Sequence, residues 1–349
     1  MNNALILFYL TSGMFMGWSL GANQMGNIFG AAVGTQMVSF RTAAIIASIF
    51  FIIGSVFGGG GAAATVGKLG DIKELAGAFV AALAAALSVF LVTKAGVPVS
   101  TTQATVGSII GWSLFKGAPI DPEIISKIVL AWVMSPLLSG IFAMCLMTFV
   151  KWYLRRFPIP LLKLDTYVRM ALIVTGAFGA YSSGANNIGN VMGVFVNASP
   201  FKDINIFNVY TLSSVQQLFL VGGIAIAVGI FTYSYKTIAT VGKNLLDLTP
   251  LSAWVVVTAH SVVLFVFASR SLKNFLESMG LPSLPLVPVS SSEAIIGAIV
   301  GIALLRKGRG LKWKSLKKVA YGWLTSPVIS ISVSFIMMFV MQNLFNQKV

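Results

Sequence analysis

The stretches LGANQMGNIFG (20–30) and SGANNIGNVMG (183–193) decide the fold, because each places Gly-Ala-Asn-x-x-Gly-Asn in an otherwise apolar segment. Of the 349 residues, 57% are hydrophobic and 9% are charged, whereas a soluble domain carries about 25% charged residues. Apolar segments of about 20 residues, the length that crosses a bilayer, recur along the chain. The sequence therefore predicts an all-α integral membrane protein with about 10 to 12 helical segments.

The charges favour a membrane protein over a nucleic-acid-binding one. The net charge of +15 comes largely from two basic segments, 151–169 and 306–318. Such segments stay on the cytoplasmic side of a membrane and contact lipid head groups. Residues 1–20 lack a basic leader and a clean cleavage site, so we expect a first spanning helix instead of a signal peptide. The single cysteine, Cys145, cannot form an internal disulfide.

Two further motifs are duplicated in the same order as the Gly-Ala-Asn motifs. PVSTTQ (98–103) recurs as PVSSSE (288–293), and AWVMSP (131–136) recurs as YGWLTSP (321–327). From Gly-Ala-Asn to PVS the distance is 77 residues in the first half and 104 in the second, which indicates an insertion of 27 residues in the second half. The order of the motifs predicts an internal repeat.

The orientation of the repeats follows from the loops after the PVS motifs. In the first half, residues 115–127 carry two basic and two acidic residues, whereas residues 306–318 carry seven basic residues and no acidic one. Equivalent loops on opposite sides of the membrane explain this difference. We therefore expect two inverted repeats, 1–160 and 161–349, in a multi-pass protein of the plasma or inner membrane with both termini outside.

Inverted repeats with interrupted spans are typical of secondary transporters. Glycines such as Gly21 and Gly184 let a helix unwind or approach another backbone closely. Pro98 and Pro288 precede runs of hydroxyl side chains, which suit the N-terminus of a short re-entrant helix, where an anion binds. The predicted substrate site consists of the asparagine amides and these hydroxyls: Asn23, Asn27, Asn186, Asn190, Ser100, Thr101, Thr102, Ser290, Ser291 and Ser292.

These motifs resemble those of the inorganic phosphate transporters of the PiT type, whose signature is similar to G-A-N-D-V-A-N followed by P-V-S-T-T-H. The resemblance spans nearly the whole chain. It implies inverted repeats with broken helices and re-entrant hairpins, a homodimer, and transport of a tetrahedral oxyanion together with a cation. The signature's aspartates, which the resemblance associates with sodium, are replaced here by Gln24 and Asn187.

The loss of both aspartates leads us to expect sulfate slightly ahead of phosphate, because phosphate keeps a proton that needs an acceptor and sulfate does not. Glu293 is an alternative acceptor, and an intramembrane carboxylate is a candidate functional group. The expected function is cation-coupled secondary transport, with sodium-coupled phosphate symport and an anion channel as alternatives. Sodium or a proton is the expected coupling ion; the residues assigned to it or to the substrate are Gln24, Asn187, Gln103 and Glu293.

Enzymatic activity is not expected, because the chain contains no histidine cluster, cysteine pair or phosphate-binding loop. We also expect no cofactor, and no metal beyond a sodium site. The single histidine, His260, lies outside the duplicated motifs and is expected to be a helix-packing residue.

Overall fold

The computed structural model describes residues 3–94, 99–206, 208–241 and 248–348; Pro98, predicted to break a span, lies outside these ranges. The described residues form twelve α-helices, two short helical turns and one two-stranded sheet. Seven of the helices are long and apolar enough to cross a membrane, which confirms the prediction of an all-α membrane protein. The elements are α1 (Asn3–Gly34), α2 (Phe40–Ile53), η1 (Gly54–Gly58), α3 (Gly60–Gly70), α4 (Leu75–Lys94), α5 (Thr101–Lys116), α6 (Pro122–Arg156), α7 (Leu161–Met192), η2 (Gly193–Phe195), β1 (Ile204–Ile206), β2 (Tyr210–Leu212), α8 (Ser214–Val241), α9 (Pro250–Ala268), α10 (Arg270–Ser278), α11 (Ser291–Leu305) and α12 (Trp313–Asn343).

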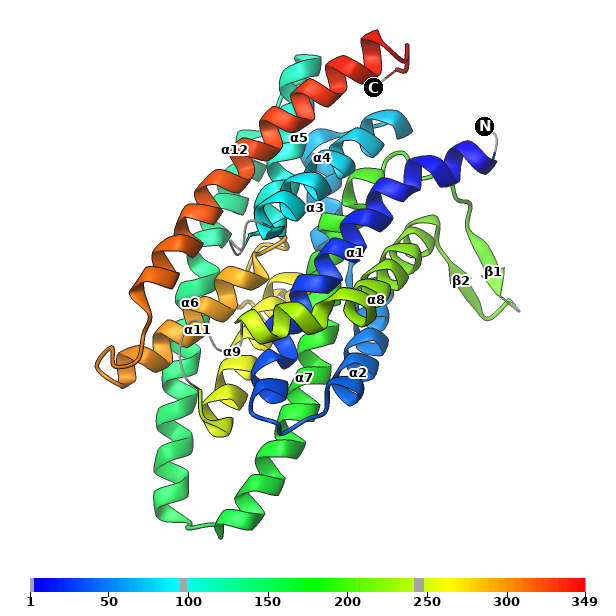
Figure 1. Ribbon diagram of the computed structural model, residues 1–349. Helices are drawn as coiled ribbons and strands as arrows, with labels where there is room; N and C mark the ends of the chain where they lie inside the picture. Colours follow the sequence, from blue (N-terminus) through cyan, green and yellow to red (C-terminus); the bar gives the residue numbers. More distant parts are fainter. Residues whose placement is uncertain (1–2, 95–98, 207, 242–247, 349) are drawn as a thin grey trace.

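The helices of one half pack against those of the other half. α1 lies along α8, and α7 lies along α2 and η1; α5 packs on α12, and α11 packs on α6. Each of these pairs has a counterpart in which the two halves exchange roles. The molecule is therefore a pair of interlocked repeats rather than two separate bundles (Figure 1).

Glycines set these pairings by allowing backbones to approach closely. A Cβ added at Gly107 of α5 would lie 2.6 Å from the carbonyl oxygen of Pro327 in α12, and a Cβ at Gly297 of α11 would collide with the carbonyl of Pro136 in α6. Both glycines lie nine residues after the proline of their PVS motif, and both prolines belong to the duplicated Ser-Pro motifs. The repeat seen in the sequence is thus a repeat of helix contacts.

The same reciprocity holds for the Gly-Ala-Asn helices. A Cβ at Gly21 would collide with the carbonyl of Ile226, and one at Gly184 with the carbonyl of Phe51. The motifs lie within the continuous helices α1 and α7, so of the two roles expected for these glycines, unwinding or close approach, the structure shows close approach. The glycines serve close helix packing here, because the absence of a side chain lets two backbones meet.

The breaks in the helices occur elsewhere. The short helices α5 and α11 begin deep in the protein after extended chain, at residues 99–100 and 281–290 respectively. In α2 the regular helix ends at Ile53 and continues as the π-helical turn η1. The hairpin β1–β2 lies in the longer interval between the Gly-Ala-Asn and PVS motifs of the second half, and Figure 1 shows it projecting from the helical body.

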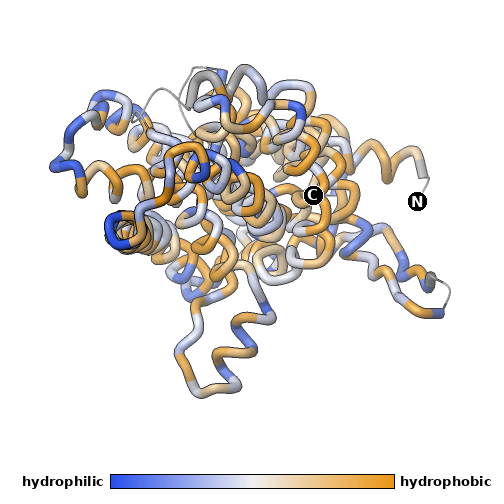
Figure 2. The backbone as a smooth tube through the Cα atoms, turned by 90° about the horizontal axis from the view of Figure 1, so that it is seen from below, coloured by the Kyte–Doolittle hydropathy of each residue, from blue (hydrophilic) through white to orange (hydrophobic). Residues whose placement is uncertain are grey.

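The ends of the helices carry the polar residues. Figure 2 shows hydrophobic residues along the helices and hydrophilic residues concentrated at helix ends and turns. In Figure 1 both termini lie at one end of the molecule, and the turn between α6 and α7 lies at the other. Much of the basic segment 151–169, expected as a loop, is helical, since α6 ends at Arg156 and α7 begins at Leu161.

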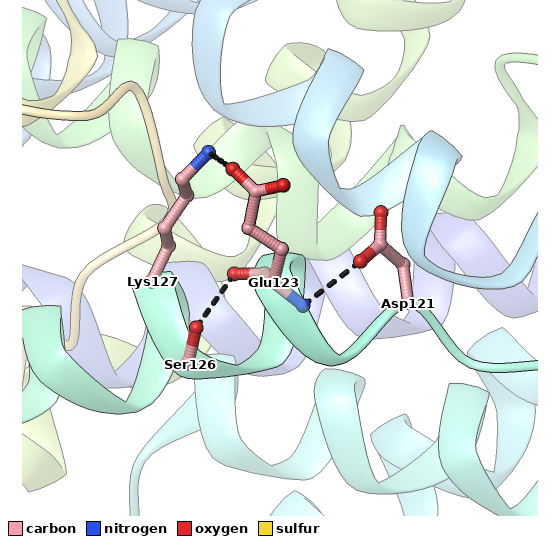
Figure 3. A network of polar contacts seen from close by, with 4 residues as sticks. All are labelled: Asp121, Glu123, Ser126 and Lys127. Atoms are coloured by element: carbon pink, nitrogen blue, oxygen red, sulfur yellow. Dashed lines mark hydrogen bonds and ion pairs between the residues drawn. The ribbon is translucent and has the colours of Figure 1, made fainter.

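The acidic residues at the start of α6 have local partners. Asp121 caps α6 by accepting the backbone N–H of Glu123 at 2.8 Å, and Lys127 contacts the Glu123 carboxylate at 2.5 Å (Figure 3). Ser126 donates to the carbonyl of Glu123 at 2.9 Å. Asp at the N-cap and Pro at the first helical position are both favoured at the start of a helix.

Candidate functional site

The N-termini of α5 and α11 meet in the centre of the protein. The side chains of Ser100 and Ser290 cap these helices, and each accepts the backbone N–H three residues later, of Gln103 and of Glu293, at 3.3 Å. Both serines are 1% exposed. The first turn of each helix leaves backbone N–H groups without helical partners and carries the positive end of the helix dipole.

The two N-termini are joined to each other by reciprocal contacts. Thr102 donates to the carbonyl of Val289 at 3.2 Å, and Ser292 donates to the carbonyl of Val99 at 3.4 Å. Each hydroxyl thus reaches the extended residue that precedes the other helix. Two positive helix ends held together in a buried region favour an anion between or beside them.

The Gly-Ala-Asn motif of α7 holds this centre in place. Asn186 donates to the carbonyl of Val289 at 2.7 Å and accepts its backbone N–H at 3.0 Å. Asn190 donates to Thr102 at 2.9 Å and to the side-chain oxygen of Asn187 at 3.2 Å. The three asparagines are almost completely buried, so the structure brings this part of the predicted site together.

The matching motif of α1 makes different contacts. Asn23 donates to the carbonyl of Ser19 in its own helix at 3.0 Å, and Asn27 donates to the side chain of Gln24 at 3.1 Å. Both asparagines are half-buried. Asn23 therefore lacks the paired bonds with an extended segment that Asn186 makes, so the two halves of the predicted site differ in their contacts.

Gln103 and Glu293, the residues that end the two PVS motifs, contact each other. The Gln103 amide donates to Glu293 Oε1 at 2.6 Å, and the Ser326 hydroxyl lies 3.5 Å from Gln103 Oε1. Glu293 is 2% exposed, and its second oxygen, Oε2, has no hydrogen-bond partner among the described residues. A buried carboxylate oxygen without a partner points to a ligand, because leaving such a group unpaired is costly.

His260 also belongs to this region, which the sequence analysis missed. Its Nε2 lies 2.7 Å from the hydroxyl of Ser291, at the first residue of α11, and the ring is fully buried. The imidazole thus positions the N-terminus of α11. The available signal was that an ionisable side chain within a membrane span is a candidate functional group.

The centre is rich in donors and poor in charge. Amides, hydroxyls and helix N-terminal N–H groups surround one carboxylate, and the described residues contain no group of three His, Cys, Asp or Glu side chains that could hold a metal. Amide and hydroxyl oxygens remain as ligands for a hard cation such as sodium. The arrangement suits an oxyanion accompanied by a monovalent cation.

The chain matches a known protein family over most of its length. The profile of the phosphate transporter family matches residues 20–166, 161–274 and 283–349. The chain belongs to this family. It is similar over 95% of its length, at 26% identity, to a protein of Methanocaldococcus jannaschii named as a candidate phosphate permease, of which it covers 94%. A similarly named Helicobacter pylori protein is 26% identical over 87% of this chain and 69% of its own length.

The fold has a counterpart among solved structures. A protein named as the sodium-dependent phosphate transporter superposes with a TM-score of 0.77 over 97% of this chain and 99% of its own, at 22% identity. This likeness confirms the fold. Membership of the phosphate transporter family confirms the resemblance seen in the motifs and identifies the protein as a transporter; it supports the phosphate alternative better than the expected sulfate preference.

Proposed function

We propose that this protein carries inorganic phosphate across the membrane by cation-coupled alternating access. The observation that supports the proposal most strongly is the meeting of two helix N-termini from opposite halves at a buried centre. Free N–H groups in the first turns of the two helices donate to the phosphate oxygens, and the two helix dipoles offset the cost of burying the negative charge.

Glu293 provides the basis for selecting phosphate over sulfate. Its Oε1 accepts a hydrogen bond from Gln103, whereas its Oε2 is buried and has no partner in the described part of the chain. A protonated phosphate donates its P–OH group to that oxygen, and sulfate has no proton to donate. This acceptor takes the place of the aspartates that the Gly-Ala-Asn motifs lack.

Sodium is the proposed coupling ion. The side chains at the two signature positions, Gln24 and Asn187, each retain an amide oxygen, and they lie one turn from Asn27 and Asn190 respectively. Such oxygens are adequate ligands for a hard cation. A protein of the same fold carries the name sodium-dependent phosphate transporter, which favours sodium over a proton for this chain.

Alternating access follows from the repeats 1–160 and 161–349, which we propose as the units that exchange roles. Asn186 is bonded to the extended segment before α11, so the second half is closed at the centre. Asn23 is bonded only within its own helix, so the first half lacks this contact. In the opposite state we expect Asn23 to bind the peptide of Val99, the counterpart of Val289. The exchange opens the centre to one side of the membrane at a time.

The proposed orientation has both termini outside a plasma or inner membrane. After replacement of Cys145, a single cysteine at Ala118 is expected to react with an impermeant thiol reagent from outside, and one at Arg309 only after permeabilisation. Reaction of both from the same side contradicts inverted repeats.

Uptake into proteoliposomes tests the transport function. Purified protein is supplied with radioactive phosphate or sulfate under an imposed sodium gradient, proton gradient, or neither. We expect saturable, sodium-driven accumulation of phosphate and weak uptake of sulfate. Flux that does not saturate and cannot be driven uphill indicates the alternative, an anion channel; preferred sulfate uptake overturns the role given to Glu293.

A further inference from the structure

A second polar region lies outside the centre described above. It is a cavity of about 420 Å³ bounded by η1, α3, α7, the start of α8 and the start of α10. Its apolar walls include Val56, Phe219 and Phe265. The polar residues that line it are Tyr181, Ser213, Gln216, Ser269, Arg270 and Ser271. Among the described residues that line the cavity, Arg270 is the only basic or acidic one, so the cavity has a cationic character.

The guanidinium group of Arg270 is held at the edge of α3. Ser269 caps α10 by accepting the backbone N–H of Leu272 at 3.2 Å, which places Arg270 at the first helical position. Nη2 of Arg270 donates to the carbonyl of Gly60 at 2.5 Å. A Cβ at Gly60 would lie 3.3 Å from the guanidinium carbon, so the glycine makes room for this contact.

Most of the hydrogen-bonding capacity of Arg270 remains for a ligand. A guanidinium has five N–H donors, and the bond to Gly60 uses one of them. Within the described ranges no carboxylate forms an ion pair with Arg270. An arginine beside a cavity that also contains serine hydroxyls matches the oxygens of a tetrahedral anion, which it binds in a bidentate manner.

The inner wall of the cavity reaches the Gly-Ala-Asn motif of α7. Ala185 lines the cavity and directly precedes Asn186, which binds the extended segment before α11. A Cβ at Gly58 would lie 2.7 Å from the Cβ of Ala185, so η1 packs tightly against this point. The cavity and the central site are therefore adjacent along one helix.

We propose that this cavity is a vestibule in which Arg270 binds the oxyanion before it passes along α7 to the central site. The inference rests on the proposed function, because it gives the transported anion a first binding position. Arg270 is solvent-exposed, so its guanidinium is accessible to an anion that enters the cavity. The net charge of +15 adds a general attraction for anions.

Charge-selective cysteine modification tests the vestibule without measuring transport. In a Cys145→Ser background, Ser213→Cys is treated with anionic and with cationic methanethiosulfonate reagents. We expect the anionic reagent to react preferentially, and Arg270→Gln to lower the anionic-to-cationic rate ratio about threefold to tenfold. Lys273→Gln removes a charge from the same helix outside the cavity lining and is the matched control, in which the ratio is expected to persist.

Protection by inorganic phosphate completes this test. Phosphate is expected to slow the anionic reagent when Arg270 is present and to have no effect in Arg270→Gln. A rate ratio that is the same with and without Arg270, or protection by phosphate that survives its replacement, overturns the proposal.

Transport kinetics separate the vestibule from the proposed function. Arg270→Gln is expected to raise the KM for phosphate about threefold to tenfold with little change in the maximal rate, and Arg270→Lys to restore part of the affinity because it keeps the charge. An unchanged KM in Arg270→Gln counts against the vestibule alone. If the wild-type protein transports no phosphate but phosphate still protects the cysteine through Arg270, the vestibule is supported and the proposed function fails.

Discussion

Replacing Asn186 with alanine is expected to destabilise the protein by about 2 to 4 kcal/mol. The change removes both bonds to the peptide of Val289, one of 2.7 Å to its carbonyl and one of 3.0 Å from its N–H. The buried N–H then has no acceptor, which costs about 1 to 3 kcal/mol, and the lost donation to the carbonyl adds about 1 kcal/mol. The carbonyl keeps its bond from Thr102, so the loss on that side is small.

Asn23 is the matched control, because it occupies the same position in the other repeat. Its amide donates only to Ser19 in its own helix, and its side chain is half-buried. Asn23→Ala is therefore expected to cost less than about 1 kcal/mol. Under the proposed alternating access, in which each asparagine supports the centre in one state, both variants are expected to reduce phosphate uptake.

The assay is reversible unfolding in mixed detergent micelles, followed by tryptophan fluorescence. A difference of about 1 kcal/mol or more between the two variants is expected. Equal destabilisation by both substitutions, or no effect of Asn186→Ala, would refute the reasoning that the halves are in different states at the centre.

Three further predictions concern packing, selectivity and coupling. Gly107→Ala brings a Cβ to 2.6 Å from the Pro327 carbonyl oxygen and is expected to lower the free energy of unfolding by about 1 to 3 kcal/mol. Its control is Gly34→Ala, which has open space around it and is expected to change the free energy of unfolding by less than about 0.5 kcal/mol in the same assay. Glu293→Gln replaces the free acceptor oxygen with a donor and is expected to weaken phosphate about tenfold or more relative to sulfate in competitive uptake; unchanged discrimination contradicts the assigned role. Combining Gln24→Asp with Asn187→Asp is expected to lower the sodium concentration that gives half-maximal uptake, because two carboxylates strengthen cation binding; an unaltered sodium dependence argues against a cation site there.

The sequence alone determined the class of the protein and much of its internal order. Apolar segments of spanning length predict membrane helices because an unpaired backbone cannot remain in hydrocarbon. The duplicated Gly-Ala-Asn, PVS and Ser-Pro motifs predicted a repeat, and the structure shows it in the matching contacts of Gly107 with Pro327 and Gly297 with Pro136. Such motifs are local, so a single sequence displays them.

The sequence was less informative about how the motifs act. Glycine permits both helix unwinding and close helix packing. The backbone of Ile226 lies directly against Gly21, and this contact shows that the glycine serves close packing. The amides at Gln24 and Asn187, in place of the aspartates of the signature, suggested sulfate, because the sequence does not show where Glu293 lies relative to these motifs. The free Oε2 of Glu293 and the family relationship together favour phosphate.

Only the tertiary structure decided which polar groups meet. Gln103 and Glu293 are 190 residues apart in the chain, yet Nε2 of Gln103 lies 2.6 Å from Oε1 of Glu293. His260 contacts Ser291 from a helix that carries none of the duplicated motifs. The asymmetry between Asn23 and Asn186 is also invisible in two motifs that begin with the same three residues. Local sequence fixes the helices and their caps, whereas these contacts depend on how the two repeats interlock through distant helix packing.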